Sequence, residues 1–233
     1  CKYTGVRYGV ATNSATSALH ISCLALGLKA NEIVWTVPNS FVASSNCALM
    51  CGAHIDFVDI DPLSNNISIS NLEEKLLKSA KKNKVPTILI VVHLAGNPCD
   101  MKQLNKLKKK YNFKIIEDAS HALGAKYYAH KVGSCNYSDI TVFSFHPVKM
   151  ITTGEGGIAL TNNKKLFELL KSYRNHGIKR FINKKKNWFY DVVRLGFNYR
   201  ITDIQCALGI SQLSKLDLRV KKRNILAKRY NKS

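Results

Sequence analysis

The sequence predicts an α/β domain with a mainly parallel central sheet flanked by helices. Short runs rich in β-branched residues alternate with helical patterns along much of the chain, as in parallel strands joined by crossover helices. One strand candidate, Pro86–Val92, is almost continuously Ile, Leu and Val, which indicates burial on both faces of the sheet, and Phe113–Glu117 is expected to be another buried strand. A length of 233 residues is enough for one sizeable domain with its own core.

Strands and helices alternate regularly in the first half of the chain. The expected strands are Arg7–Thr12, Glu32–Val37, His54–Asp59, Pro86–Val92 and Phe113–Glu117, and the expected helices are Ala15–Leu28, Phe41–Cys51, Ser70–Lys82 and Asp100–Tyr111. The helix from Ser70 to Lys82 has the strongest pattern, because Ser70 and Glu73 have the spacing of a capping box. Its stripe of Leu72, Leu76, Leu77 and Ala80 predicts one buried face.

The pattern changes in the second half of the chain. Between Ala125 and Thr161, glycine-rich turns separate three expected strands, Ala125–Tyr128, Ile140–Phe145 and Gly157–Thr161. A helix is expected at Lys164–Tyr173. A second helix starts at a capping box formed by Thr202 and Gln205 and runs to about Leu213, and a third runs from Leu216 to the end. The chain begins at Cys1 and ends in a charged, helix-like stretch. We therefore expect residues 1–233 to be a fragment of a longer protein.

Charge and composition narrow the classes of partner. Lysine and arginine outnumber aspartate and glutamate by 36 to 15, a net charge of +21, which would suit a polyanion. The lysines are scattered, however, and lack the aromatic interleaving of an RNA-binding sheet. We therefore favour solvated lysines and expect no nucleic-acid partner, although the charge leaves that alternative open. No apolar run approaches the length of a membrane span, so no membrane partner is expected either.

The cysteines and histidines suggest neither a disulfide framework nor a metal site. There are seven cysteines, an odd number, without a CxxC pair, which indicates thiols in a reducing compartment and favours a cytoplasmic protein. The seven histidines are dispersed without the spacing of paired metal ligands. We therefore expect no bound metal.

Three segments have the residue types of a chemical site. Asp118 follows the strand candidate IIE, and ligands of open α/β sheets bind at such carboxyl ends; alternatively it caps the next turn. Lys149 lies in a turn between two expected strands, beside TTGEGG, where a lysine acts as a nucleophile only if its pKa is lowered; alternatively it is a surface lysine. The stretch from Thr12 to Leu19 joins a strand to a helix and suits either a phosphate or an ordinary helix cap.

Taken together and in this order, the segments resemble the DegT family of pyridoxal-phosphate (PLP)-dependent sugar aminotransferases, within the fold-type-I aminotransferases. The matching segments are NSATSAL, TVPNSFVASSN, VHLAGNP, IIEDASHALGA, FSFHPVKMITTGEGGIALTNN, RNHGI and GFNYRITDIQCALGISQL. They run from about residue 10 to about residue 220. The resemblance implies that the chain is the PLP-binding large domain, with an N-terminal segment and a C-terminal small domain missing.

The resemblance also implies roles for residues around the cofactor ring. Lys149 matches the catalytic lysine that holds PLP as a Schiff base. Asp118 matches the carboxylate that pairs with the pyridinium nitrogen, and Phe41 matches the aromatic residue stacked on the ring. His121 stands where the family has glutamine or histidine near the phenolic oxygen. An anionic Asp118 would keep the ring nitrogen protonated, so that the ring accepts electrons.

Further residues match the phosphate contacts of the family. Ala15 and Thr16 lie at the start of the first expected helix, and Ser144 supplies a hydroxyl. Asn198 matches an asparagine that reaches the cofactor phosphate of the partner subunit, which implies a homodimer. The basic segment from Lys179 to Trp188 is either a solvated loop or a contact to the diphosphate of a nucleotide.

The activity implied by the resemblance is transamination of a UDP-linked 4-keto-6-deoxy amino sugar, with glutamate as the amino donor. The product would be a 4-amino sugar nucleotide for pseudaminic acid or a related surface glycan. Two alternatives remain. In the related PLP-dependent sugar dehydratases the lysine is replaced by histidine, so Lys149 argues against that activity. A non-catalytic regulator that binds PLP or a sugar would not require Lys149, Asp118 and Ser144 together.

Overall fold

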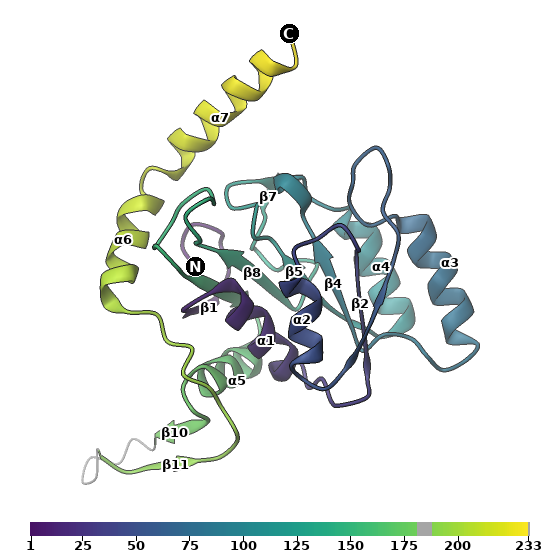
Figure 1. Cartoon of the computed structure of the whole chain (residues 1–233), viewed down its shortest axis with the longest axis horizontal. Helices are drawn as coiled ribbons and strands as arrows, with labels where there is room; N and C mark the ends of the chain where they lie inside the picture. The colour runs from purple at the N-terminus through teal and green to yellow at the C-terminus, as the bar shows by residue number, and fades with distance from the viewer. Residues whose placement is uncertain (181–187, 233) are drawn as a thin grey trace.

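A seven-stranded sheet forms the centre of the computed structural model, which describes residues 1–180 and 188–232 (Figure 1). Its strand order is β1-β9-β8-β5-β4-β2-β3. The strands are β1 (Tyr8–Thr12), β2 (Ile33–Thr36), β3 (His54–Phe57), β4 (Ile88–Val92), β5 (Lys114–Asp118), β8 (Ile140–Ser144) and β9 (Gly157–Thr161). Within this sheet, as far as the chain is described, β9 is antiparallel to both of its neighbours, β1 and β8, and the other neighbouring strands are parallel. The prediction of an α/β domain with a mainly parallel sheet is confirmed.

Helices cover both faces of the sheet (Figure 1). Helices α1 (Ala15–Ala25), α2 (Ala43–Leu49) and α5 (Lys164–Arg174) pack on one face, and α3 (Ile69–Ala80) and α4 (Met101–Tyr111) pack on the other. Strand β4 shows why the apolar runs are continuous. Its residues Ile88 and Ile90 contribute to the first core, whereas Leu89 and Val91 contribute to the second, because successive strand side chains point to opposite faces.

The remaining elements lie at the edges of this body. A one-turn 3-10 helix, η1 (Leu94–Gly96), follows β4, and β6 (Lys126–Tyr127) pairs with β7 (His130–Lys131) in a short hairpin. A second hairpin pairs β10 (Ile178–Arg180) with β11 (Tyr190–Val192). Helix α6 (Asp203–Leu213) and helix α7 (Leu216–Tyr230) end the chain, and α7 projects away from the body (Figure 1).

One helix start differs from its prediction. Helix α3 is capped by Ser68, whose Oγ accepts a hydrogen bond from the backbone N–H of Asn71 at 3.2 Å, and not by Ser70. Ser70 lies inside the helix, and its hydroxyl bonds to that of Ser68. A β-bridge between Ile60 and Ile67 fixes the preceding chain, so the turn into the helix comes two residues earlier than local sequence suggests. The predicted capping box of α6, Thr202 with Gln205, is confirmed.

Two other predictions are altered or stay open. The strand predicted at Ala125–Tyr128 is shortened to two paired residues, because Tyr128 has a positive φ of 51° in a turn. The hairpin of β10 and β11 was not predicted, and most of the basic segment between them, residues 181–187, lies outside the described residues. Its contact to a diphosphate stays a prediction. Among the helices of the described residues, none is both long and apolar enough to cross a membrane.

Candidate active site

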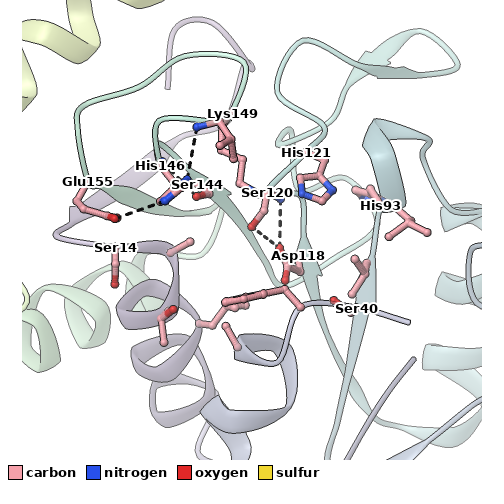
Figure 2. Close-up of a pocket in the computed structure, with 18 residues that line it drawn as sticks. Ser14, Ser40, His93, Asp118, Ser120, His121, Ser144, His146, Lys149 and Glu155 are labelled. Atoms are coloured by element: carbon pink, nitrogen blue, oxygen red, sulfur yellow. Dashed lines mark hydrogen bonds and ion pairs between the residues drawn. The ribbon is translucent and has the colours of Figure 1, made fainter. Parts of the chain in front are cut away.

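A cavity of about 510 Å³ opens at the carboxyl ends of β4, β5 and β8, beside the N-terminus of α1 (Figure 2). Ligands of α/β sheets bind at this edge. Seven of the eight predicted site residues line the cavity: Ala15, Thr16, Phe41, Asp118, His121, Ser144 and Lys149. Asn198 does not line the cavity. It is exposed in the segment before α6 and forms an isolated β-bridge with Asn175. The role of Asn198 toward a partner subunit, and the roles of the other seven toward a cofactor, stay predictions.

The Asp118 carboxylate is held firmly at the floor of the cavity. Asp118 ends β5 and is 5% exposed. Its Oδ1 accepts from the backbone N–H of Ser120 at 3.2 Å and from the Ser120 hydroxyl at 2.6 Å (Figure 2). Its Oδ2 accepts from the Ser44 hydroxyl at 2.6 Å. A carboxylate offers about four acceptor sites, so about one remains for a donor in the cavity. Asp118 thus caps the following turn and still faces the cavity.

Sequence reasoning missed Ser44. Its side chain is fully buried in α2, 74 positions before Asp118 in the chain. The only local signal is that Ser44 shares a helix face with Cys47 and Ala48, which makes it a polar residue in an apolar stripe. Ser40 lines the cavity, and its hydroxyl lies 3.0 Å from that of Ser44. A short chain of hydroxyl groups therefore leads from the cavity to the back of Asp118.

Lys149 lies in the connection between β8 and β9, as predicted. Partial burial lowers the pKa of its amine below the ordinary lysine value, although attraction to Asp118 works in the opposite direction. Burial and the Lys149 charge together lower the pKa of His121, against the attraction of Asp118. The amine of Lys149 is therefore neutral at lower pH than that of a solvated lysine, which favours nucleophilic chemistry.

The N-terminus of α1 provides a site for an anion. The Ser14 hydroxyl caps the helix by accepting the backbone N–H of Ser17 at 3.1 Å. The first helical N–H groups, those of Ala15 and Thr16, have no acceptor within the helix, and the first turn has no acidic residue. Gly157 permits this arrangement, because a Cβ there would lie 2.5 Å from the backbone N of Ala15. Helix N-termini of this kind bind phosphate.

A buried hydrogen-bond network supports the same edge of the sheet. His93 lines the cavity after β4, and its Nε2 lies 2.8 Å from Oε2 of Glu117. The Nδ1 of His93 accepts the backbone N–H of Cys99 at 3.1 Å, so Nε2 carries the proton that is donated to Glu117. Ser138 and Thr141 donate to the other Glu117 oxygen. Burial works to raise the pKa of Glu117, but the bonds from His93 and the two hydroxyls hold it below its ordinary value.

Comparison with known proteins identifies the family of this chain over its whole length. Residues 1–233 match the DegT/DnrJ/EryC1/StrS aminotransferase family. The chain is 47% identical over 232 residues to the UDP-4-amino-4,6-dideoxy-N-acetyl-β-L-altrosamine transaminase of Campylobacter jejuni subsp. jejuni serotype O:2, covering 100% of this chain and 59% of that relative. The chain therefore spans about three fifths of the length of this relative.

Two solved structures share the fold. Helicobacter pylori PseC, described as an aminotransferase involved in the biosynthesis of pseudoaminic acid, has 35% sequence identity and a TM-score of 0.83, over 94% of this chain and 56% of that chain. NtdA from Bacillus subtilis, solved with bound cofactor PMP, has 32% identity and a TM-score of 0.84, over 98% of this chain and 49% of that chain. The similarity thus extends to a structure that contains the amine form of PLP.

Proposed function

Because the chain belongs to the DegT/DnrJ/EryC1/StrS aminotransferase family, we propose that it forms the cofactor-binding domain of a PLP-dependent nucleotide-sugar aminotransferase. The acceptor is a UDP-linked 4-keto-6-deoxy amino sugar, the donor is glutamate, and the product enters pseudaminic acid or related glycan synthesis. One observation carries the proposal: the amine of Lys149 and the carboxylate of Asp118 line one cavity beside a helix N-terminus. Similarity to the Campylobacter jejuni transaminase and to PseC supports the class of sugar.

The residues of the cavity fit PLP. The remaining acceptor site of Asp118 suits a ring N–H, and the uncapped N–H groups at Ala15 and Thr16, with the Ser144 hydroxyl, suit the phosphate. Phe41 lines the cavity with 76% of its surface exposed, so a flat ring can stack on it at little cost in side-chain entropy. Lys149 supplies the amine that the cofactor aldehyde requires.

Each of these residues contributes one physical task. Bound PLP supplies a Schiff-base carbon and an electron-accepting ring. The negative charge of Asp118 holds a proton on the ring nitrogen. Nζ of Lys149 would, as a free amine of lowered pKa, carry a proton between the substrate carbon that bears the nitrogen and the cofactor carbon. Phe41 covers one face of the ring and excludes water from it.

Borohydride reduction tests the proposal directly. The full-length protein, purified with PLP, is reduced and digested, and the modified peptide is identified by mass spectrometry. We expect a pyridoxyl group on Lys149 and on no other lysine. Lys149→Ala should lose both the adduct and turnover while keeping its fold, whereas Lys109→Ala, at an exposed site on α4, should keep both. No adduct on any lysine would favour the non-catalytic binding protein, and dehydration without amination of the sugar would favour the dehydratase.

A further inference from the structure

We propose that Ser44 is a positioning residue, which orients the Asp118 carboxylate toward the cavity and thereby controls how firmly the cofactor ring holds its proton. The inference rests on the proposed function, because it concerns the same cavity. Ser44 itself does not line the cavity. Ser44 therefore acts on a bound ring through its neighbours: its hydroxyl donates to Asp118 at 2.6 Å and lies 3.0 Å from the hydroxyl of Ser40, which lines the cavity.

The contacts of Asp118 show what Ser44 adds. Ser120 supplies both of its hydrogen bonds to the same oxygen, Oδ1. With Ser120 alone, the carboxylate would be held at one oxygen, and Oδ2 could turn about it. The bond from Ser44 to Oδ2 fixes the second oxygen and so the plane of the carboxylate. Because Ser44 is fully buried, no water can take over this role without disturbing the packing of α2.

The position of Ser44 in α2 links two parts of the site. Phe41 lies three residues before Ser44, just ahead of the start of α2, and lines the cavity. The bond to Asp118 joins α2, which follows β2 in the chain, to the end of β5. Strand β4 separates β5 from β2 in the sheet. One hydrogen bond therefore sets the distance between the residue proposed for the ring face and the residue proposed for the ring nitrogen.

The electrostatic effect of Ser44 has a definite sign. A carboxylate held facing the cavity keeps its negative charge beside the ring N–H, so the ring keeps its proton and stays more positive, and the Schiff-base nitrogen becomes less basic. Removing the Ser44 hydroxyl lets the carboxylate turn away from the ring, which has the opposite effect on the Schiff-base nitrogen. The Schiff-base nitrogen should then hold its proton to higher pH.

The experiment compares Ser44→Ala with Ser45→Ala in the full-length protein. Ser45 is the adjacent serine of α2, and its hydroxyl bonds only to the carbonyl of Val42 among the described residues. Two readouts are taken without substrate: the dissociation constant of PLP, and the pH titration of the visible absorption band of the bound cofactor. For Ser44→Ala we expect about a tenfold weaker PLP affinity and a titration midpoint raised by about one pH unit, which is the scale of one hydrogen bond to a charged group. Ser45→Ala should match the wild type.

A second variant separates the hydrogen bond from packing. Ser44→Cys keeps the shape of the side chain with a somewhat larger atom that donates more weakly, so it should shift the midpoint in the same direction by a smaller amount. Wild-type values in both Ser44 variants would overturn the inference while leaving the proposed function intact. Equal shifts in Ser44→Ala and Ser45→Ala would also overturn it, because they would show a general effect of α2. Wild-type protein without a PLP adduct would overturn the proposed function together with the inference.

Discussion

Asp118 and Glu117 are adjacent residues of β5 with different tasks. Strand alternation sends their side chains to opposite faces of the sheet, so Asp118 meets Ser44 and the cavity while Glu117 meets His93. Both carboxylates are nearly buried, and each is satisfied by several donors, as buried charges require. The acidic pair that ends this strand therefore combines a candidate cofactor contact with a structural hydrogen-bond network.

Replacing Asp118 by asparagine tests the proposed counter-charge. The amide keeps the shape of the side chain but removes its negative charge. We expect a folded protein whose PLP dissociation constant rises about tenfold to a hundredfold, since a hydrogen bond to a charged group contributes about 1.5–3 kcal/mol. Turnover should fall at least as far. Absorbance titration with PLP measures the affinity; unchanged affinity and kinetics would remove Asp118 from the site.

The Glu117 network predicts a pH dependence of stability. The pKa of Glu117 is lower in the folded protein than its ordinary value, so its contribution is complete above the unfolded pKa of about 4.3 and is lost as the pH falls through the folded pKa. Glu117→Gln should lower the free energy of unfolding by about 1.5–3 kcal/mol at pH 7. The difference from wild type should shrink below about pH 4.

Urea unfolding at a series of pH values measures this difference. Glu73→Gln serves as the control, because Glu73 is an exposed carboxylate of α3, and it should unfold like the wild type at every pH. A Glu117→Gln variant that is equally destabilised at pH 7 and at pH 3 would show that packing, and not the charge of Glu117, supports this edge of the sheet.

At the scale of elements, the approach of β9 to α1 positions the anion site. Gly157 begins β9 directly beside the backbone of Ser14 and Ala15, where any Cβ would overlap the chain. Gly157, the last glycine of the run after Lys149, is therefore explained by close packing of a strand against a helix start. The run is not a phosphate-binding loop, since a strand follows it.

The start of α3 gives a matched pair of serine variants. Ser68 caps the helix, whereas Ser70 lies in its first turn. Ser68→Ala should lower the free energy of unfolding by about 1 kcal/mol, because the backbone N–H of Asn71 loses its acceptor. Ser70→Ala should be nearly neutral, since alanine is the better helix former. Denaturant midpoints measure both variants, and a larger loss in Ser70→Ala would restore the capping box predicted from the sequence.

At the scale of the whole molecule, the chain exposes apolar side chains outside the sheet and its two cores. On α6, Ile204 is 84% exposed and Ile210 is 73% exposed, and Leu195 and Val192 are also exposed in the preceding segment. Large apolar side chains that are this exposed are candidates for burial in an interface. The position of Asn198 within this region agrees with the proposed homodimer, in which it would reach the partner subunit.

Substituting Ile204 tests the proposed homodimer. In the full-length protein, Ile204→Glu places a charge on the exposed face of α6 and should raise the dimer dissociation constant about tenfold or more, as truncation of an interface anchor does. Leu63→Glu is the control, because Leu63 is 94% exposed in the loop between β3 and α3. Sedimentation velocity measures both. Identical dimerisation of the two variants would place the interface elsewhere.

Local sequence determined much of the fold and part of the site. The continuous apolar run of β4 specified burial on both faces, and the alternation of strands with helices specified a parallel sheet. Asp118 at a strand end and Lys149 between two strands follow from the same pattern. These features were predictable because periodicity, caps and turns depend on residues that are close together in the chain.

Only the tertiary structure decided the remaining features. The bond between Ser44 and Asp118 joins residues 74 positions apart, and the cap of α3 depends on a bridge formed earlier in the chain. No local pattern encodes such contacts, because they arise when elements that are separate in sequence pack together. The predicted role of Asn198 would require a second chain, so neither the sequence nor the fold of one chain decides it. The sequence by itself thus determined the elements and the chemical groups, and packing decided how those groups are held.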